Sequence, residues 1–338
     1  MKFVQVADVH FDVPFTTISD RADLGEMRRI EQRKAFKKMI NFIKENNVEY
    51  LFICGDLYEH EYIRKSTIEF INNEFKEIPD TQIFIAPGNH DPMTRDSYYK
   101  NYNWTDNVKI FTSHVDNVDL GECEVWGYGF DSFELKSNEI DNLDLNHDKF
   151  NILLTHGDLY TDSIYNHISN AKAFDYVAIG HIHKRDDFYS GSLISLGFDE
   201  TGEHGFIYGE VENKKLFRKF IKADDRELIV DELDISNINS EEELVEKLNS
   251  VECGDNLYEI KLIGNRNVNT DINLKLIQEN IIKIKDKTSF KLDIEQKKDE
   301  KTLTGFFVKN LKKMLENDDI NEEQYQKILE LGNRVLNK

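Results

Sequence analysis

The residues of this chain that could do chemistry stand directly after short apolar runs. The run at residues 83–85 leads through a Pro-Gly pair into Asn89, His90 and Asp91, which together offer an amide, an imidazole and a carboxylate. Four other apolar runs have the same form, and they lead into Asp8 and His10, into Asp56, into His156, and into His181 and His183. Five buried strands would therefore deliver polar side chains at their carboxyl ends, the edge at which open α/β sheets form their sites.

This mixture of Asp, Asn and His suits divalent transition metal ions. Imidazole together with carboxylate favours Mn, Fe or Zn over Ca, and a candidate set without Cys argues against a structural zinc site. Asp8 and His10 stand two residues apart at a strand end, so both side chains can reach one ion. The later His-x-His pair has the same spacing. Asp56 can bridge two ions, and Asn89 supplies a neutral oxygen where an anionic substrate must bind.

The segments between these residues alternate apolar runs with amphipathic stretches. Strands are predicted at residues 2–7, 48–54 and 82–86, and the intervening residues 28–45 and 65–76 have apolar positions at helical spacing. This order predicts parallel strands joined by right-handed crossovers. Further strands are expected at residues 108–111, 124–127, 150–155 and 174–179, with a meander over 187–221. The predicted fold class is α/β (α+β), a sandwich of two sheets flanked by helices.

The pattern changes near residue 224. The next segments predict, in order, a strand at 228–235, a helix at 240–248, a strand at 258–263, a helix at 271–284 and a strand at 289–294. This βαβαβ order indicates a small separate α/β unit. After a charged linker at 295–301, the last residues predict an α-hairpin with a broad apolar face. We therefore expect three domains, at residues 1–223, 224–298 and 299–338.

Composition limits the class of protein. The chain has 338 residues, of which 43 are basic and 64 acidic, and its net charge of −21 should repel phosphate. This counts against a general nucleic-acid coat but leaves room for a local basic groove. Three scattered cysteines without a CxxC pair favour a reducing compartment. Neither a secretory leader nor an apolar run of about 20 residues is visible, so the expected location is cytoplasmic, without a membrane.

Five short motifs resemble those of the calcineurin-like metallophosphoesterases, in the family's order. They are Asp8-x-His10, Gly55-Asp56, Gly88-Asn89-His90-Asp91, His156-Gly157 and Gly180-His181-x-His183. The stretches 7–15, 189–193 and 197–205 further resemble the DNA-repair exonuclease branch of that family, of the SbcD and YhaO type. The specific resemblance covers about residues 1–210, and beyond that point it rests on architecture alone.

The resemblance implies a site with two metal ions. One ion would be held by Asp8, His10, Asp56 and His183, and the other by Asp56, Asn89, His156 and His181. Mn²⁺ is the ion most expected, with Fe or Zn as alternatives. A hydroxide between the ions would attack phosphorus in line. His90 would protonate the leaving oxygen or steady the phosphate, and Asp91 would hold the other ring nitrogen of His90.

One position departs from the family pattern. Three residues after Asp56, bacterial members often have Asp and archaeal or eukaryal members have His, whereas this chain has Glu59 followed by His60. That position tends to contact the substrate side in the family. Glu59 and His60 are therefore expected to bind substrate, and the preference between exonuclease and endonuclease cleavage stays open.

The resemblance implies a DNA nuclease subunit that works in DNA repair with an ATPase. The unit at 224–298 would be its capping domain, and the hairpin at 299–338 would hold the coiled coil of an ABC-type ATPase of the SbcC or YhaN type. Homodimerisation through the helices at 28–45 and 65–76 is also expected. A small-molecule phosphodiesterase or phosphatase is the alternative, which the acidic charge favours. A non-catalytic scaffold is a third hypothesis, against which the intact set of ligands argues.

Several other residues have ordinary interpretations. His204 is expected at the surface or in a turn, and the basic residues between 28 and 38 are expected on a solvated helix face. The aromatic run at 98–104 could stack nucleic-acid bases, but packing on the core is favoured. Asp12 and Asp158 are equally compatible with supporting the metal site and with solvated turns.

Overall fold

A computed structural model of the protein describes residues 1–15, 24–134, 139–160, 168, 171–266, 268–289 and 301–336. The chain divides into two compact units, one of Met1–Val230 with Cys253–Glu259 and one of Asp231–Glu252 with Ile260–Lys338. Among the described residues, no helix is long and apolar enough to cross a membrane.

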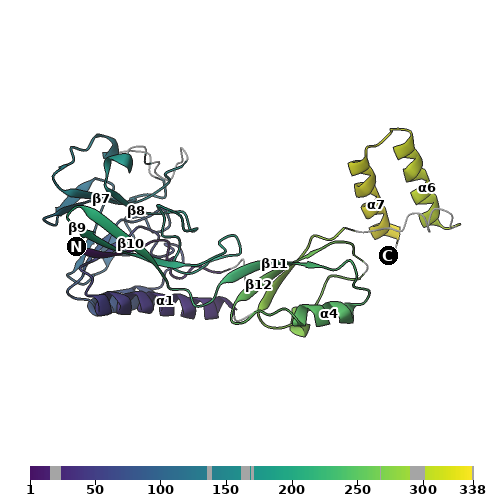
Figure 1. Ribbon diagram of the computed structural model, residues 1–338, viewed down its shortest axis with the longest axis horizontal. Helices are drawn as coiled ribbons and strands as arrows, with labels where there is room; N and C mark the ends of the chain where they lie inside the picture. Colours follow the sequence, from purple (N-terminus) through teal and green to yellow (C-terminus); the bar gives the residue numbers. More distant parts are fainter. Residues whose placement is uncertain are drawn as a thin grey trace. The chain divides into compact units, whose positions relative to one another are not determined.

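The first unit contains a six-stranded sheet in the order β10-β9-β1-β2-β3-β4. Its parallel strands are β1 (Lys2–Val6), β2 (Tyr50–Ile53), β3 (Gln82–Ile85) and β4 (Val108–Ile110), and β9 (Gly205–Glu212) and β10 (Lys215–Lys222) form an antiparallel hairpin beside β1. Helices α1 (Leu24–Asn46) and α2 (Lys65–Lys76) connect successive parallel strands, and α1 lies along one face of the sheet (Figure 1). The predicted strand–helix–strand order is confirmed.

A second, four-stranded sheet has the order β5-β6-β7-β8. It consists of β5 (Asp116–Asp119), β6 (Cys123–Tyr128), β7 (Phe150–His156) and β8 (Tyr176–Gly180), with the last three parallel. The 3₁₀ turns η2 (Glu139–Asn142) and η3 (Ala171–Ala173) lie before and after β7, and the short helix α3 (Tyr98–Asn101) lies between β3 and β4 of the first sheet. Strand β5 was not predicted, because its acidic residues at both ends break the apolar alternation.

Apolar side chains fill the space between the two sheets. Phe3, Phe52 and Phe84 come from the first sheet, and Ile152 and Leu154 come from the second, all of them buried. Burial of each such side chain stabilises the fold by roughly 1.5–3 kcal/mol. This shared core confirms the predicted two-sheet sandwich, and it holds the carboxyl ends of β1, β2, β3, β7 and β8 at fixed positions.

A three-stranded sheet follows the sandwich along the chain. Its order is β11-β12-β13, with β11 at Leu228–Asp234, β12 at Leu257–Ile263 and β13 at Ile281–Asp286. Helix α4 (Glu241–Asn249) covers one face of this sheet (Figure 1). The hydroxyl of Ser240 accepts a hydrogen bond from the backbone N–H of Glu243, and the Glu243 carboxylate accepts one from the backbone of Asn239. This capping box begins α4 where the sequence predicted a helix.

The predicted helix at 271–284 is wrong. The structure has only a 3₁₀ turn there, η4 (Leu274–Leu276), and then β13. Asn273 caps the short turn through its side chain, Ile277 after it is extended, and Gln278 is held by Asn249 and Leu248. A second turn, closed by the bond from the Ile281 N–H to the Gln278 carbonyl, then leads into β13. The Ile-Ile-Lys-Ile-Lys sequence then favours a strand, since β-branched residues pack well on a pleated surface. Most of the expected strand at 289–294 lies outside the described residues.

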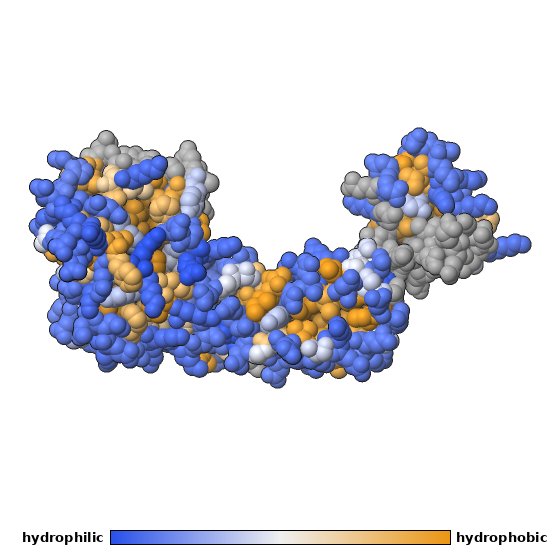
Figure 2. All heavy atoms as spheres, viewed as in Figure 1, coloured by the Kyte–Doolittle hydropathy of each residue, from blue (hydrophilic) through white to orange (hydrophobic). Residues whose placement is uncertain are grey.

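The chain ends in the predicted α-hairpin of α6 (Leu303–Glu316) and α7 (Glu322–Leu336). Val308 and Leu311 of α6 pack against Tyr325 and Leu329 of α7 to form a core of their own. The side chain of Thr302 caps α6 by accepting from the backbone of Gly305. Apolar surface is also exposed on the hairpin (Figure 2).

The aromatic run at 98–104 packs on the core, as favoured from the sequence. Tyr99 is buried against Tyr58, and Trp104 lies against Phe75 of α2. The indole N–H of Trp104 donates to the carbonyl of Tyr98. Tyr99 and Trp104 therefore stabilise the loop after β3.

Arg28 is not on a solvated helix face, which corrects the prediction for this residue. Its side chain is fully buried, and its guanidinium donates to the Asp224 carboxylate at 3.0 Å, to the Ser195 carbonyl at 2.8 Å and to Glu31 at 2.6 Å. Position 28 lies one helical turn before the buried Gln32, on the side of α1 that faces the sheet. The buried positive charge of Arg28 is stabilised because acceptors from three parts of the chain surround it.

Replacement of Arg28 tests this buried ion pair. Arg28→Ala leaves the Asp224 carboxylate buried without its partner, so we expect the free energy of unfolding to fall by roughly 3–5 kcal/mol. Chemical denaturation monitored by circular dichroism measures the change. The exposed Lys34→Ala on the same helix is the control and should stay within about 0.5 kcal/mol of the wild type. Equal stability of both variants would contradict the assigned role.

Candidate metal centre

The loops that carry the predicted ligands have an unusual backbone. Asp8, His10 and Asp56 have φ near +51°, and His181 has φ of 109°. Each such residue costs roughly 1–3 kcal/mol of strain, and Asp and His tolerate this region better than most residues do. Backbone hydrogen bonds from Asp8 to Gly55 and from His10 to Asp56 hold the first two loops in place. The strained backbone turns the side chains inward at the end of each strand.

Two motif glycines leave room for the ligands themselves. A Cβ at Gly55 would overlap the ring of His156, and the φ of +81° at Gly55 also disfavours other residues. A Cβ at Gly88 would overlap the carboxylate of Asp56. The ligand side chains therefore occupy the space that larger residues would take.

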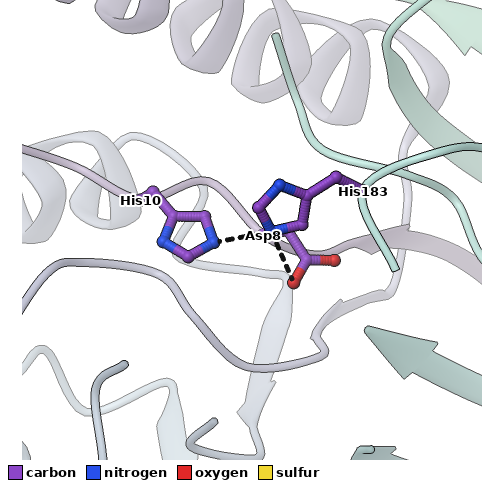
Figure 3. A group of neighbouring side chains, drawn as sticks. All are labelled: Asp8, His10 and His183. Carbon is purple, nitrogen blue, oxygen red and sulfur yellow. Dashed lines mark hydrogen bonds and ion pairs between the residues drawn. The ribbon is translucent and has the colours of Figure 1, made fainter. Parts of the chain in front are cut away.

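Asp8, His10 and His183 form the first cluster, from loops far apart in the sequence (Figure 3). The Nε2 atoms of His10 and His183 lie 3.0 Å apart, and Nε2 of His183 lies 3.9 Å from the Asp8 carboxylate. Two imidazole nitrogens bound at right angles to one ion, each about 2.1 Å from it, lie about 3 Å apart. The spacing of these two rings therefore fits a shared metal ion.

Carboxylates hold the far sides of both rings. Nδ1 of His10 lies 2.7 Å from Glu59, and Nδ1 of His183 lies 2.6 Å from Glu200. A proton on each Nδ1, donated to the carboxylate, leaves the Nε2 lone pair for a metal ion. Burial opposes a charge on His183, yet Glu200 and Asp8 raise the pKa of His183 to about 9.

Asp8, Asp56 and His156 form the second cluster. Nε2 of His156 lies 3.0 Å from the side-chain oxygen of Asn89 and 3.2 Å from Asp56, and its Nδ1 lies 2.8 Å from the carbonyl of Cys54. The ring of His181 stands edge-on to that of His156, with 5.3 Å between the ring centres. All seven predicted metal ligands therefore converge on one place.

Asp8 belongs to both clusters, and the carboxylate of Asp56 lies near a histidine of each. Its Oδ2 atom lies 3.2 Å from Nε2 of His156 and 3.7 Å from Nε2 of His10. Its Oδ1 atom accepts the backbone N–H of His90 at 2.8 Å, which leaves Oδ2 for both clusters. Burial would raise the pKa of Asp56, but His156 and His10 hold it well below its usual range. This arrangement of donors fits a carboxylate that bridges two divalent ions.

His90 stands beside the clusters and is 47% exposed. Its ring lies edge-on to His10 with 4.8 Å between centres, and its Nδ1 lies 3.0 Å from Glu59. The hydrogen bond to Glu59 outweighs desolvation and raises the pKa of His90 to about 9. Burial opposes a charge on Glu59, yet its hydrogen bonds to His10 and His90 lower the pKa of Glu59 to about 2. One anionic carboxylate thus orients the ring of His10, a predicted metal ligand, and the protonated ring of His90.

Asp91 does not hold His90, contrary to the role predicted for it. Its fully buried carboxylate accepts the backbone N–H groups of Gly88, Asp56 and Leu57, at 2.7, 3.0 and 2.6 Å, and the hydroxyl of Tyr99 at 2.6 Å. The reason is that buried backbone donors of two neighbouring loops need an acceptor. Burial and the nearby Asp56 raise the pKa of Asp91 to about 6. Asp91 therefore fixes the loops that carry Asp56 and Asn89.

The sequence prediction missed Glu200 as a support of the site. Glu200 contacts Ser192 at 3.2 Å as well as His183, and its backbone carbonyl lies 2.7 Å from His204. His204 is almost fully buried, so its assignment to the surface is wrong. The stretch that contains Glu200 was part of the family resemblance, but nothing in its local pattern indicated a contact with His183.

The other predicted residues take lesser positions. His60 does not touch the ligands; its ring stands edge-on to Phe133 with 5.8 Å between centres, and its Nε2 lies 3.5 Å from Asp96. Asp12 accepts the backbone N–H of Arg64, and Asp158 accepts that of Tyr160. Asp12 therefore links its loop to the residue before α2, whereas the bond of Asp158 is local to a turn.

Comparison with known proteins decides the family. The model of the calcineurin-like phosphoesterases matches residues 1–185, which include all five motifs and all seven predicted ligands. This chain is a calcineurin-like phosphoesterase. Members of this family are hydrolases that use divalent metal ions, in agreement with the clusters of Asp and His described above.

Two relatives extend the comparison beyond the family model. The chain is 25% identical over 250 residues to the uncharacterized metallophosphoesterase YhaO of Bacillus subtilis; this covers 67% of the chain and 61% of YhaO. It is also 25% identical over 369 residues to the SbcD component of the nuclease SbcCD from Staphylococcus saprophyticus; this covers 92% of the chain and 93% of SbcD. The resemblance to the SbcD and YhaO type is therefore confirmed.

Metal binding should depend on pH in a defined direction. His156 and His183 both have pKa values raised to about 9, and each must lose its proton to ligate an ion. We expect the affinity for Mn²⁺ to rise by about tenfold per pH unit for each of these two histidines below pH 9. Isothermal titration calorimetry between pH 6.5 and 8.5, in buffers of different ionisation enthalpy, measures affinity and proton release. An affinity that does not change with pH would contradict the assignment.

Proposed function

We propose that this phosphoesterase is a DNA nuclease with two metal ions, a phosphodiester hydrolase that acts in DNA repair. The observation that carries the proposal is the Asp56 carboxylate, which lies near His10 of one ligand cluster and His156 of the other, with the protonated ring of His90 beside it. The resemblance to a nuclease subunit over nearly the whole of both chains supports DNA as the substrate. We infer hydrolysis from the site, and we infer the substrate from the relative.

The ligand sets follow from the two clusters. Asp8, His10, Asp56 and His183 would hold one ion, and Asp56, Asn89, His156 and His181 the other. We propose Mn²⁺ for both, because mixed imidazole and carboxylate donors suit it. When bound, two such ions activate a water for attack on phosphorus and stabilise the charge that develops.

The residues of the chain supply the proton and its position. His90 is proposed to donate a proton from Nε2 to the leaving oxygen, since its pKa of about 9 keeps the ring protonated at neutral pH. Glu59 holds Nδ1 of the same ring at 3.0 Å, so that Nε2 is turned away from the carboxylate. Asp91 acts through the backbone and is a positioning residue.

A small-molecule phosphodiesterase or phosphatase is the second candidate. The net charge of −21 favours it, because long-range repulsion opposes the approach of DNA and bound metal ions offset only part of that charge. The YhaO relative carries no stated substrate in its name, so it supports either candidate.

Digestion of end-labelled linear DNA tests the proposed function. We expect the purified protein to remove the label with Mn²⁺ and to leave it intact with EDTA. His90→Asn should keep its bound metal, measured by mass spectrometry of the metal content, and lose turnover by roughly 10²–10⁴-fold, the contribution of a general acid. His114→Asn, a change of the same kind at an exposed surface histidine, is the matched control and should cut as the wild type does.

Two outcomes would contradict this proposal in different ways. Loss of metal from His90→Asn in parallel with turnover would remove the assigned role of His90. Intact DNA, with bis-p-nitrophenyl phosphate still hydrolysed, would favour the small-molecule candidate, unless addition of the ATPase partner restored cleavage.

We further propose that the terminal hairpin binds the coiled coil of an SbcC- or YhaN-type ATPase, and that residues 1–223, 224–298 and 299–338 act as catalytic domain, capping domain and partner-binding hairpin. Val308 and Leu311 face the hairpin core, whereas Leu303 and Phe306 are 74% and 65% exposed on a different face of α6. A second apolar face on a short hairpin is typical of a surface that a partner helix covers.

Charge introduced on that face tests the partner site. Phe306→Asp should abolish co-purification with the ATPase and leave the unfolding temperature within about 2 °C of the wild type, since the side chain is exposed. Lys327→Asp puts the same side chain at an exposed position of α7 and should still co-purify. Retention of the ATPase by Phe306→Asp would contradict the proposal.

Homodimerisation through α1 and α2 and a cytoplasmic location remain proposals. The cysteine content motivates the location, and the family resemblance motivates the dimer. Light scattering that gives a monomeric mass at working concentration would count against the dimer, and fractionation of cells would test the location.

A further inference from the structure

A cavity of about 400 Å³ opens beside the metal centre. Glu59, Asn89 and His90 line the side towards the ligands, and Tyr62 and Phe133 line the same cavity together with His60 and Glu61. The cavity therefore joins the predicted acid and one metal ligand to two aromatic rings that the mechanism does not use.

The two aromatic side chains are unusually open for their type. Tyr62 is 52% exposed and Phe133 is 50% exposed. Single exposed apolar residues are common on protein surfaces and need no explanation. Here, however, two exposed rings line one cavity that also contains His90 and Asn89. Such a cavity offers flat apolar faces near the proposed site of the reacting phosphate.

The residues around Tyr62 are held in place before any ligand binds. The backbone N–H groups of Tyr62 and Ile63 both donate to the carbonyl of Glu59, at 3.0 and 2.8 Å, and the N–H of His60 donates to the carbonyl of His90 at 2.9 Å. The ring of His60 also supports Phe133 from its edge. A ligand that stacks here loses little free energy to ordering of the protein.

The charges of the lining favour a neutral ligand. Glu59 and Glu61 line the cavity, the protonated ring of His90 offsets the charge of only one of them, and none of the lining residues that the structure describes is Lys or Arg. A phosphate would be repelled here and would bind at the metal ions instead. A planar base stacks on aromatic rings without any need for positive charge, which suits a chain whose net charge is −21.

We propose that this cavity binds the nucleobase of the terminal nucleotide next to the cleaved phosphate, stacked on Tyr62 and Phe133. The assignment rests on the proposed DNA nuclease function and adds to it that a terminal base must leave the duplex before cleavage. DNA with frayed or single-stranded ends is therefore the preferred substrate. Stacking of one base changes affinity by about tenfold or more.

The test compares DNA ends with and without a base. Labelled duplexes carry an abasic residue at the terminal nucleotide, in separate substrates at the 3′ and the 5′ end. We expect the wild type with Mn²⁺ to show a kcat/KM about tenfold higher for the base-bearing end at one of the two positions. In Tyr62→Ala with Phe133→Ala this ratio should fall to about one, mainly through KM.

Two further variants separate stacking from general damage. Tyr62→Phe keeps the ring and should keep the wild-type ratio. Phe217→Ala removes another half-exposed ring, on β10, and should also keep it. In EDTA, where no cleavage occurs, the wild type should quench the fluorescence of a terminal 2-aminopurine, and the double variant should not.

The outcomes distinguish this inference from the function on which it rests. DNA cleavage with a ratio of about one in the wild type, or with a ratio that the double variant retains, would overturn the base site alone. No cleavage of DNA, with bis-p-nitrophenyl phosphate still hydrolysed, would overturn the proposed function and the base site with it.

Discussion

The candidate metal centre depends on one buried carboxylate that lies near both groups of predicted ligands. Asp56 turns one oxygen to the backbone of His90 and the other to His10 and His156. A buried carboxylate without partners would bind a proton, so the surrounding histidines and N–H groups keep it charged. Asp91 is the counterpart, since it is buried as deeply but accepts backbone N–H groups and a tyrosine hydroxyl instead of histidines. Two neighbouring carboxylates thus have different roles because their hydrogen-bond partners differ: Asp56 faces the histidines, and Asp91 holds the loops.

Much of the fold and of the ligand set could be predicted from the sequence. Each apolar run is followed by Asp, Asn or His, and parallel strands bring their carboxyl ends to one edge. The seven predicted ligands therefore converge, as expected from their positions after the strands. The chemistry of this edge depends on few residues, all of which stand inside short motifs.

The supports of the ligands could not be predicted in the same way. Glu59 lies 49 residues from His10, and Glu200 lies 17 residues from His183, so only the tertiary fold brings each pair together. The same holds for Arg28, which looks like part of a basic helix face until Asp224 is placed beside it. The helix prediction for residues 271–284 was wrong for a local reason, because the isoleucines there fit a helical period and a strand equally well. The hydrogen bonds of Asn273 and Gln278 favour the non-helical conformation.

The left-handed backbone at Asp8, His10 and Asp56 affects how the site can be dissected by mutation. Alanine at these positions removes the ligand and also places a residue that disfavours positive φ on a strained loop. Part of any loss after such a change would belong to the backbone, which then relaxes and moves the neighbouring ligands. Asparagine tolerates this conformation nearly as well as aspartate, so Asp8→Asn and Asp56→Asn isolate the charge of the ligand from the shape of its loop.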